Sequence, residues 1–146
     1  MVSPYLPPPI ESATDPVHSA ADMGRRWQAL MGPLGFGQRL LWIGFVGADR
    51  RMYQTMSQLP LGSRPTRRLV GDVMSRLRFV VDNIEEPTTV AFLLTRPGSG
   101  PISDLDRQWA CLLTDAANEH GVPIEPIFRA NDESLVLVDA QTADIR

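Results

Sequence analysis

Two short apolar runs constrain the fold of this chain more than any other feature of its sequence. Residues 40–46 read Leu-Leu-Trp-Ile-Gly-Phe-Val, and residues 88–94 read Thr-Thr-Val-Ala-Phe-Leu-Leu. Apolar runs of this length, rich in aromatic and β-branched residues, are typical of strands that are buried on both faces of a sheet. We therefore expect a central sheet that other elements cover on both sides.

Three amphipathic segments can supply that cover. Apolar residues recur every three or four positions over residues 19–31, 66–84 and 103–120, a spacing that predicts one apolar face on a helix. In the first and third segments a serine precedes an aspartate by three residues, which is the capping-box pattern of a helix start. Gly32 and Gly121 follow these two segments and indicate where the helices end.

Shorter runs with strand character complete the pattern. Residues 52–59 are predicted to return as the second strand of a hairpin, and residues 124–129 and 134–138 to form a terminal hairpin. The order is then helix, hairpin, helix, strand, helix, hairpin. This order predicts an α/β domain with a mixed sheet of about five strands and helices on both faces.

The length of 146 residues fits one ordinary domain. Residues 1–18 hold five of the thirteen prolines and few residues that could pack, which predicts a flexible N-terminal arm. We assign residues 19–146 to a single α/β domain.

Nothing in the sequence indicates export or insertion into a membrane. No apolar run approaches the roughly 20 residues needed to cross a bilayer. Residues 1–12 lack the basic and apolar regions of a secretory signal. The single cysteine, Cys111, cannot form an intramolecular disulfide. We therefore expect a cytoplasmic protein with no membrane partner.

The charges of the chain are unevenly distributed. Residues 24–78 carry ten arginines and two acidic residues, whereas residues 79–146 carry four arginines and twelve acidic residues. Such asymmetry can indicate an anionic partner for the basic half or self-association between opposite faces. The simpler interpretation is that the two halves neutralise each other across the fold.

The stretch from residue 93 to residue 106 carries the most specific pattern in the sequence. The end of a predicted strand leads into a Pro/Gly/Ser-rich loop, and Ser103 and Asp106 then open a helix as Ser-x-x-Asp. This stretch resembles the metal-site motif of the JAB/MPN group of hydrolases, RadC-like proteins in particular. The resemblance extends over about residues 39–139 and implies a cytidine-deaminase-like layering of helices and sheet.

In that group the strand ends in His-x-His, and two imidazoles and a carboxylate hold a catalytic zinc ion with one open position. Here Leu94 and Arg96 stand at the two histidine positions, while Ser103 and Asp106 match the family pattern. Asp106 alone cannot hold a zinc ion, and the two histidines of the chain lie elsewhere in the sequence. The resemblance therefore implies a degenerate metal site, with no metal, no cofactor and no zinc-dependent hydrolase activity.

Two interpretations of Asp106 stay open at this point. We hypothesise that Arg96 pairs with Asp106 and replaces the metal as the electrostatic tie between strand and helix. The alternative is that Asp106 only completes the capping box with Ser103, which is worth about 0.5–2 kcal/mol.

The same loop could also bind a small anion. Gly98, Ser99 and Gly100 precede a helix start whose free N–H groups favour phosphate or carboxylate, and Arg96 stands beside them. A glycine-rich turn that only satisfies backbone geometry is the simpler explanation of these residues.

Three functions follow from these observations. The first is a non-catalytic interaction or scaffold module whose partner is another protein or a second copy, as the resemblance implies for inactive JAB/MPN members. The second is nucleic-acid binding, since RadC-like proteins are associated with DNA repair; its candidate contacts are Arg50, Arg51, Arg64, Arg67 and Arg68. The third is an enzyme or anion-binding protein that uses residues 96–103.

Overall fold

The computed structural model describes residues 7–62 and 64–138. Its elements are η1 (Ile10–Thr14), α1 (Ala20–Met31), β1 (Leu40–Val46), β2 (Ser57–Pro60), α2 (Arg67–Asp82), β3 (Thr89–Thr95), α3 (Asp104–His120), β4 (Phe128–Ala130) and β5 (Leu135–Leu137).

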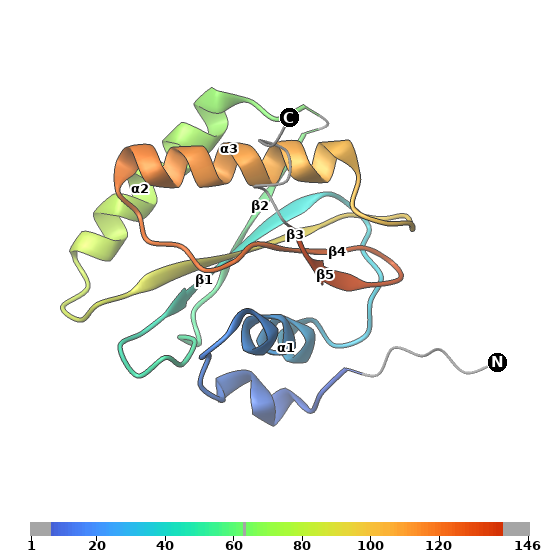
Figure 1. Ribbon diagram of the computed structural model, residues 1–146, viewed down its shortest axis with the longest axis horizontal. Helices are drawn as coiled ribbons and strands as arrows, with labels where there is room; N and C mark the ends of the chain where they lie inside the picture. The colour runs from blue at the N-terminus through green and yellow to red at the C-terminus, as the bar shows by residue number, and fades with distance from the viewer. Residues whose placement is uncertain (1–6, 63, 139–146) are drawn as a thin grey trace.

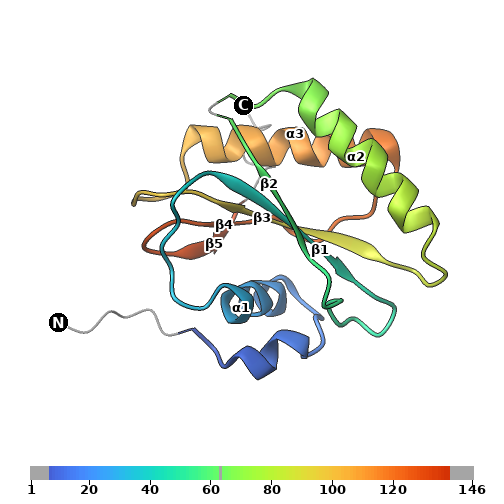
Figure 2. The same cartoon turned by 180° about the vertical axis from the view of Figure 1, so that it is seen from behind.

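The five strands form one mixed sheet in the order β2-β1-β3-β4-β5. β1 runs antiparallel to β2 and β3, β4 runs parallel to β3, and β5 runs antiparallel to β4. Figures 1 and 2 show α1 and η1 on one face of this sheet, with α2 and α3 on the other. The prediction of an α/β fold with a mixed five-stranded sheet covered on both faces is confirmed.

Alternate side chains of β3 enter two separate apolar layers. Phe92 and Leu94 belong to the cluster beneath α2 and α3, whereas Ala91 and Leu93 belong to the cluster over α1. Because both faces of the strand are covered, its residues do not alternate between apolar and polar as they do in a strand with one face in water. This accounts for the unbroken apolar run in the sequence. The helix residues that close the two layers include Val70, Met74, Trp109 and Leu113 on one side and Met23 and Trp27 on the other.

The helix starts agree with the capping patterns, with one variation. Ser103 and Asp106 form the full reciprocal box at α3. At α1 the side chain of Ser19 accepts the N–H of Asp22, but the Asp22 carboxylate accepts the N–H of His18 instead of that of Ser19. The predicted ends of these helices at Gly32 and Gly121 are also confirmed.

The second strand of the first hairpin is shorter than predicted. Of residues 52–59, Met52 makes an isolated bridge to Val46, and regular pairing resumes only where Ser57 lies opposite Ile43. Between these two pairs four residues on the returning strand, 53–56, lie opposite two residues of β1, 44 and 45. Two extra residues have to leave the ladder between these pairs, as in an enlarged β-bulge, and this ends the regular strand.

The N-terminal boundary also differs from the prediction. Within the expected flexible arm of residues 1–18, residues 10–14 form η1, which packs on α1. Val17 has no exposed surface. Its N–H donates to the Arg50 carbonyl at 2.7 Å, and Nε of Arg50 donates to the Val17 carbonyl at 2.7 Å. The fold therefore includes residues 10–17, while residues 1–6 of the predicted arm lie outside the described residues.

Within the described part of the chain, no helix is long and apolar enough to cross a membrane.

The packing of Val17 gives a first prediction. We expect Val17→Ala to lower the free energy of unfolding by about 2 kcal/mol, because a fully buried side chain loses methyl contacts and leaves a cavity. Ile10→Ala is the matched control: Ile10 is 60% exposed, so its truncation should change the free energy by about 0.5 kcal/mol or less. Urea unfolding of the three proteins measures both values. Equal, small effects would mean that residues 10–17 do not belong to the fold.

Candidate functional site

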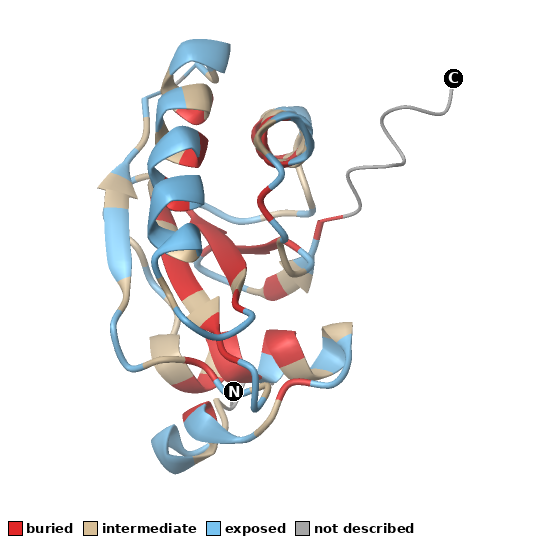
Figure 3. Ribbon diagram, turned by 90° about the vertical axis from the view of Figure 1, so that its left-hand side faces the viewer, coloured by how far each residue is buried: buried red, intermediate tan, exposed pale blue. Residues whose placement is uncertain are grey.

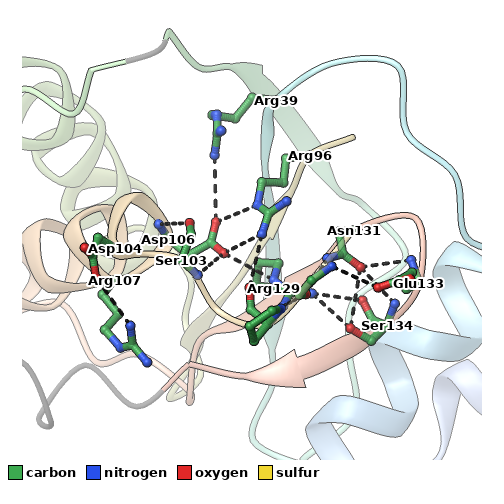
Figure 4. A network of polar contacts seen from close by, with 12 residues as sticks. Arg39, Arg96, Ser103, Asp104, Asp106, Arg107, Arg129, Asn131, Glu133 and Ser134 are labelled. Atoms are coloured by element: carbon green, nitrogen blue, oxygen red, sulfur yellow. Dashed lines mark hydrogen bonds and ion pairs between the residues drawn. The ribbon is translucent and has the colours of Figure 1, made fainter. Parts of the chain in front are cut away.

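The motif that the sequence singles out lies at the end of β3. Arg96 directly follows the strand, residues 97–103 form a loop, and α3 begins at Asp104. The loop returns the chain so that the first turn of α3 faces the end of the strand, as Figure 4 shows. Strand and helix thereby bring Arg96 and Asp106 together.

Arg96 and Asp106 form a buried, two-pronged ion pair. Nε of Arg96 donates to Oδ1 of Asp106 at 2.9 Å, and Nη2 donates to Oδ2 at 3.0 Å. The backbone N–H of Ser103 donates to the same Oδ2 at 2.9 Å. Asp106 is 1% exposed. The hypothesised pair and the capping box are therefore both present, and one carboxylate serves both.

Two further arginines approach the same carboxylate. Nε of Arg129, from β4, lies 3.3 Å from Oδ2 without hydrogen-bond geometry, and Nη1 of Arg39 lies 3.8 Å from Oδ1. The side chain of Arg129 has no exposed surface, whereas that of Arg39 is 25% exposed. Three guanidinium groups thus surround one carboxylate. We call Arg39, Arg96, Arg129 and Asp106 the arginine cluster.

Arg129 is held by more than this charge contact. Its Nη1 donates to the hydroxyl of Ser134 at 3.1 Å, and its Nη2 donates to the carbonyl of Gly100 at 3.2 Å. Asn131 donates to the same Gly100 carbonyl at 3.0 Å. These bonds connect the 97–103 loop with β4 and the turn that follows it.

The pKa values of the cluster reflect burial and mutual attraction. Burial acts to raise the pKa of Asp106, but the hydrogen bonds from Arg96 and Ser103 outweigh it and hold this pKa below its ordinary value. The bond to Asp106 raises the pKa of Arg96. Burial lowers the pKa of Arg39 and Arg129, and the nearby Arg96 acts in the same direction, so the attraction of Asp106 offsets only part of the effect. All four groups nevertheless carry charge at neutral pH.

Leu94 contributes no polar group to this site. It lies two residues before Arg96 on the same face of β3 and is 4% exposed in the apolar cluster beneath α2 and α3. Among the described residues there is no group of three His, Cys, Asp or Glu side chains that could hold a metal ion.

The backbone of the glycine-rich loop already donates hydrogen bonds to two carboxylates of the same chain. The N–H of Gly98 donates to Asp132 at 2.8 Å, and the N–H of Gly100 donates to Glu133 at 2.9 Å. Both glycines have φ near +95°, in the region that favours glycine. The suggested anion site at Arg96, Gly98, Ser99 and Gly100 therefore has two of its N–H donors and its guanidinium already engaged.

The five arginines considered for nucleic-acid binding do not form one surface. Arg50 and Arg51 follow β1, at the end where Val46 pairs with Met52. The other three, Arg64, Arg67 and Arg68, follow β2 at the opposite end, where Pro60 pairs with Leu40. Arg50 is further committed to Glu125, to which both terminal nitrogens donate at 3.0 Å.

Some of the opposite charges of the two halves meet inside the fold. Arg39 reaches Asp106, and Arg50 reaches Glu125, so both pairs join the basic segment 24–78 to the acidic segment 79–146. These contacts favour the interpretation in which the halves neutralise each other.

An open cleft of about 570 Å³ lies at the other end of the sheet, beside Thr89 at the start of β3. Two of its charged side chains already have partners: Glu86 accepts the hydroxyl of Tyr53, and Arg78 donates to Asp82 and to the Gly121 carbonyl. These side chains of the cleft are therefore engaged in contacts within the chain.

Sequence reasoning missed Arg39 and Arg129 as members of the cluster. The available signal for Arg129 was a charged residue that ends a predicted strand directly after Ile127 and Phe128, because a buried charge at such a position requires a partner. Arg39 could be placed only after the β1–β3 register was known, since pairing of Leu40 with Thr95 puts Arg39 opposite Arg96.

Comparison with family models, with curated proteins and with solved structures found no match to this chain. The resemblance to the JAB/MPN group therefore stays a prediction.

The lowered pKa of Asp106 allows a test by pH. A carboxyl with a depressed folded-state pKa stabilises the fold above its unfolded pKa, about 3.9, and this contribution is lost as the pH falls through the folded value. We expect Asp106→Asn to lower the free energy of unfolding by a constant amount from about pH 7 to pH 5, and by progressively less below about pH 4. Urea unfolding across this range measures the difference.

Asp82→Asn is the matched control, because it removes the carboxylate of an exposed pair with Arg78. Exposed pairs contribute about 0–1 kcal/mol, so this variant should stay close to the wild type. If Asp106→Asn lowered the free energy of unfolding as much below about pH 4 as at pH 7, the described role of the Asp106 charge would be contradicted.

Proposed function

We propose that this chain is a non-catalytic interaction module built on a degenerate JAB/RadC-like fold. The observation that carries the proposal is the state of Asp106. Both of its oxygens accept hydrogen bonds from the protein, two from Arg96 and one from Ser103, and two more arginines stand within 4 Å. A metal ion could reach this carboxylate only by displacing a buried guanidinium.

The chemistry of the position supports the same reading. Arg96 brings a fixed positive charge to the carboxylate of Asp106, as a bound metal would, and ties the end of β3 to the first turn of α3. A guanidinium has no open coordination position and cannot activate water as zinc does. Arg96 can therefore supply the structural part of a metal's role without the catalytic part.

The surface provides the second support. α2 exposes Phe79 and Val80, which are 71% and 40% accessible. A large aromatic side chain in water is common where another protein binds. An interaction function is consistent with a closed polar site at one end of the sheet and an open apolar patch on a helix.

The resemblance can be tested by restoring the histidines. We expect the wild-type protein to retain no zinc after dialysis, and Leu94→His combined with Arg96→His to gain about one equivalent, with Asp106 as the third ligand. Elemental analysis measures the zinc, and the visible absorption of the cobalt-loaded protein reports its coordination. The single Arg96→His variant, which leaves the core residue Leu94 in place, should bind more weakly.

Adding Asp106→Asn to the double-histidine variant is the control and should abolish tight binding. If the folded double-histidine variant bound no metal, the assignment of Leu94 and Arg96 to the ligand positions would be wrong. Stoichiometric zinc in the wild-type protein would overturn the proposed function itself.

A further inference from the structure

The outward face of α2 combines an exposed phenylalanine, with Val80 at its flank, and charges that have no ion-pair partner within the described residues. Val70, Met74 and Leu77 point into the core. Phe79 follows Val70 by nine residues, which at roughly 100° per residue places it on the opposite side of the helix. A phenylalanine thus lies at the point of α2 farthest from the core, and Figure 3 shows this outer face as exposed.

Three charged side chains share that face. Arg68, Asp72 and Arg76 are exposed, and each lies about one turn from the next along the helix. Within the described residues none of the three has an ion pair shorter than 4 Å, although Asp72 and Arg76 are four residues apart on one helix. The other acid of α2, Asp82, pairs with Arg78.

We propose that α2 of a second copy covers this face, antiparallel and related by a two-fold axis. The inference rests on the proposed interaction function and names its partner. In a two-fold pair the same surface serves both subunits, so a residue pair that matches once matches twice. A register that sets Asp72 opposite Arg76 of the partner subunit also sets Arg76 opposite Asp72 of the partner subunit.

The same register places the apolar residues in contact. Phe79 then lies beside Leu69 of the partner subunit, and Val80 beside the aliphatic part of Arg68 of the partner subunit. In the isolated chain Leu69 is half-buried at the flank of α2. The antiparallel arrangement therefore covers Phe79 and Val80 and pairs Asp72 and Arg76 at once.

Self-complementarity favours a second copy over other partners. An acidic partner would meet the Asp72 carboxylate in the middle of its binding surface, which like-charge repulsion disfavours. A nucleic acid would meet the same carboxylate, and a duplex would leave Phe79 uncovered. A second α2 brings an arginine to the aspartate and an apolar flank to the phenylalanine.

Analytical ultracentrifugation of the full chain over the micromolar range tests the inference. We expect a concentration-dependent dimer. Phe79→Ser should raise the dissociation constant roughly 30-fold or more, as truncation of a buried aromatic can do at other interfaces, because the two-fold pair loses this contact twice. Asp72→Arg should raise it roughly tenfold, because two arginines then face each other twice. Ile10→Ser, at an exposed apolar position on η1 beneath the other face of the sheet, is the matched control and should leave association unchanged.

The combined charge swap is the decisive variant. Asp72→Arg together with Arg76→Asp exchanges the two charges and should restore the dimer that Asp72→Arg alone weakens. All substituted positions are exposed, and melting curves establish that each variant is folded. A wild-type chain that stays monomeric, a dimer indifferent to Phe79→Ser, or a swap that fails to restore association would each overturn the antiparallel α2 pairing. None of these results would alter the metal-binding outcome on which the proposed function depends.

Discussion

The buried carboxylate of Asp106 is the constraint on which one end of this fold depends. Arg39, Arg96 and Arg129 come from the ends of three neighbouring strands, and each contacts this one group at the first turn of α3. Desolvation of a guanidinium costs several kcal/mol unless an opposite charge compensates it. Without the carboxylate, three like charges would repel one another, so the position of α3 and the arrangement of the strand ends are coupled.

The end of the sheet at the 97–103 loop and the outward face of α2 differ in how far their polar groups are paired within the chain. The 97–103 loop is held by Asp132 and Glu133 from the turn after β4, and by Arg129 through the Gly100 carbonyl. This end of the sheet is closed by its own side chains. The outward face of α2 is occupied by none of the described residues, and its Phe79 is the most exposed large apolar side chain among them. The proposed account assigns stability to the first region and association to the second.

The sequence predicted those features whose causes are local. Capping residues located the starts of α1 and α3, and the apolar runs located β1 and β3, because both signals depend on neighbours in the chain. The Arg96–Asp106 pair was hypothesised from the resemblance of residues 93–106 to the JAB/MPN motif, in which these two positions hold metal ligands. The roles of Arg39 and Arg129 depend on strand register. The hydrogen bond from the N–H of Gly98 to Asp132 joins residues 34 positions apart. The bulge after Met52 and the packing of Val17 likewise follow from tertiary contacts that no local pattern encodes.

A double-mutant cycle between Arg96 and Asp106 tests most directly whether their charge pair ties β3 to α3. Arg96→Met and Asp106→Asn are compared singly and together by urea unfolding at neutral pH. The account predicts that each single change costs about 3–5 kcal/mol, because it removes the hydrogen-bonded partner of a buried charge, and that the double change costs clearly less than the sum. Additive effects, or single changes that cost less than about 1 kcal/mol, would contradict the claim that this pair holds strand and helix together.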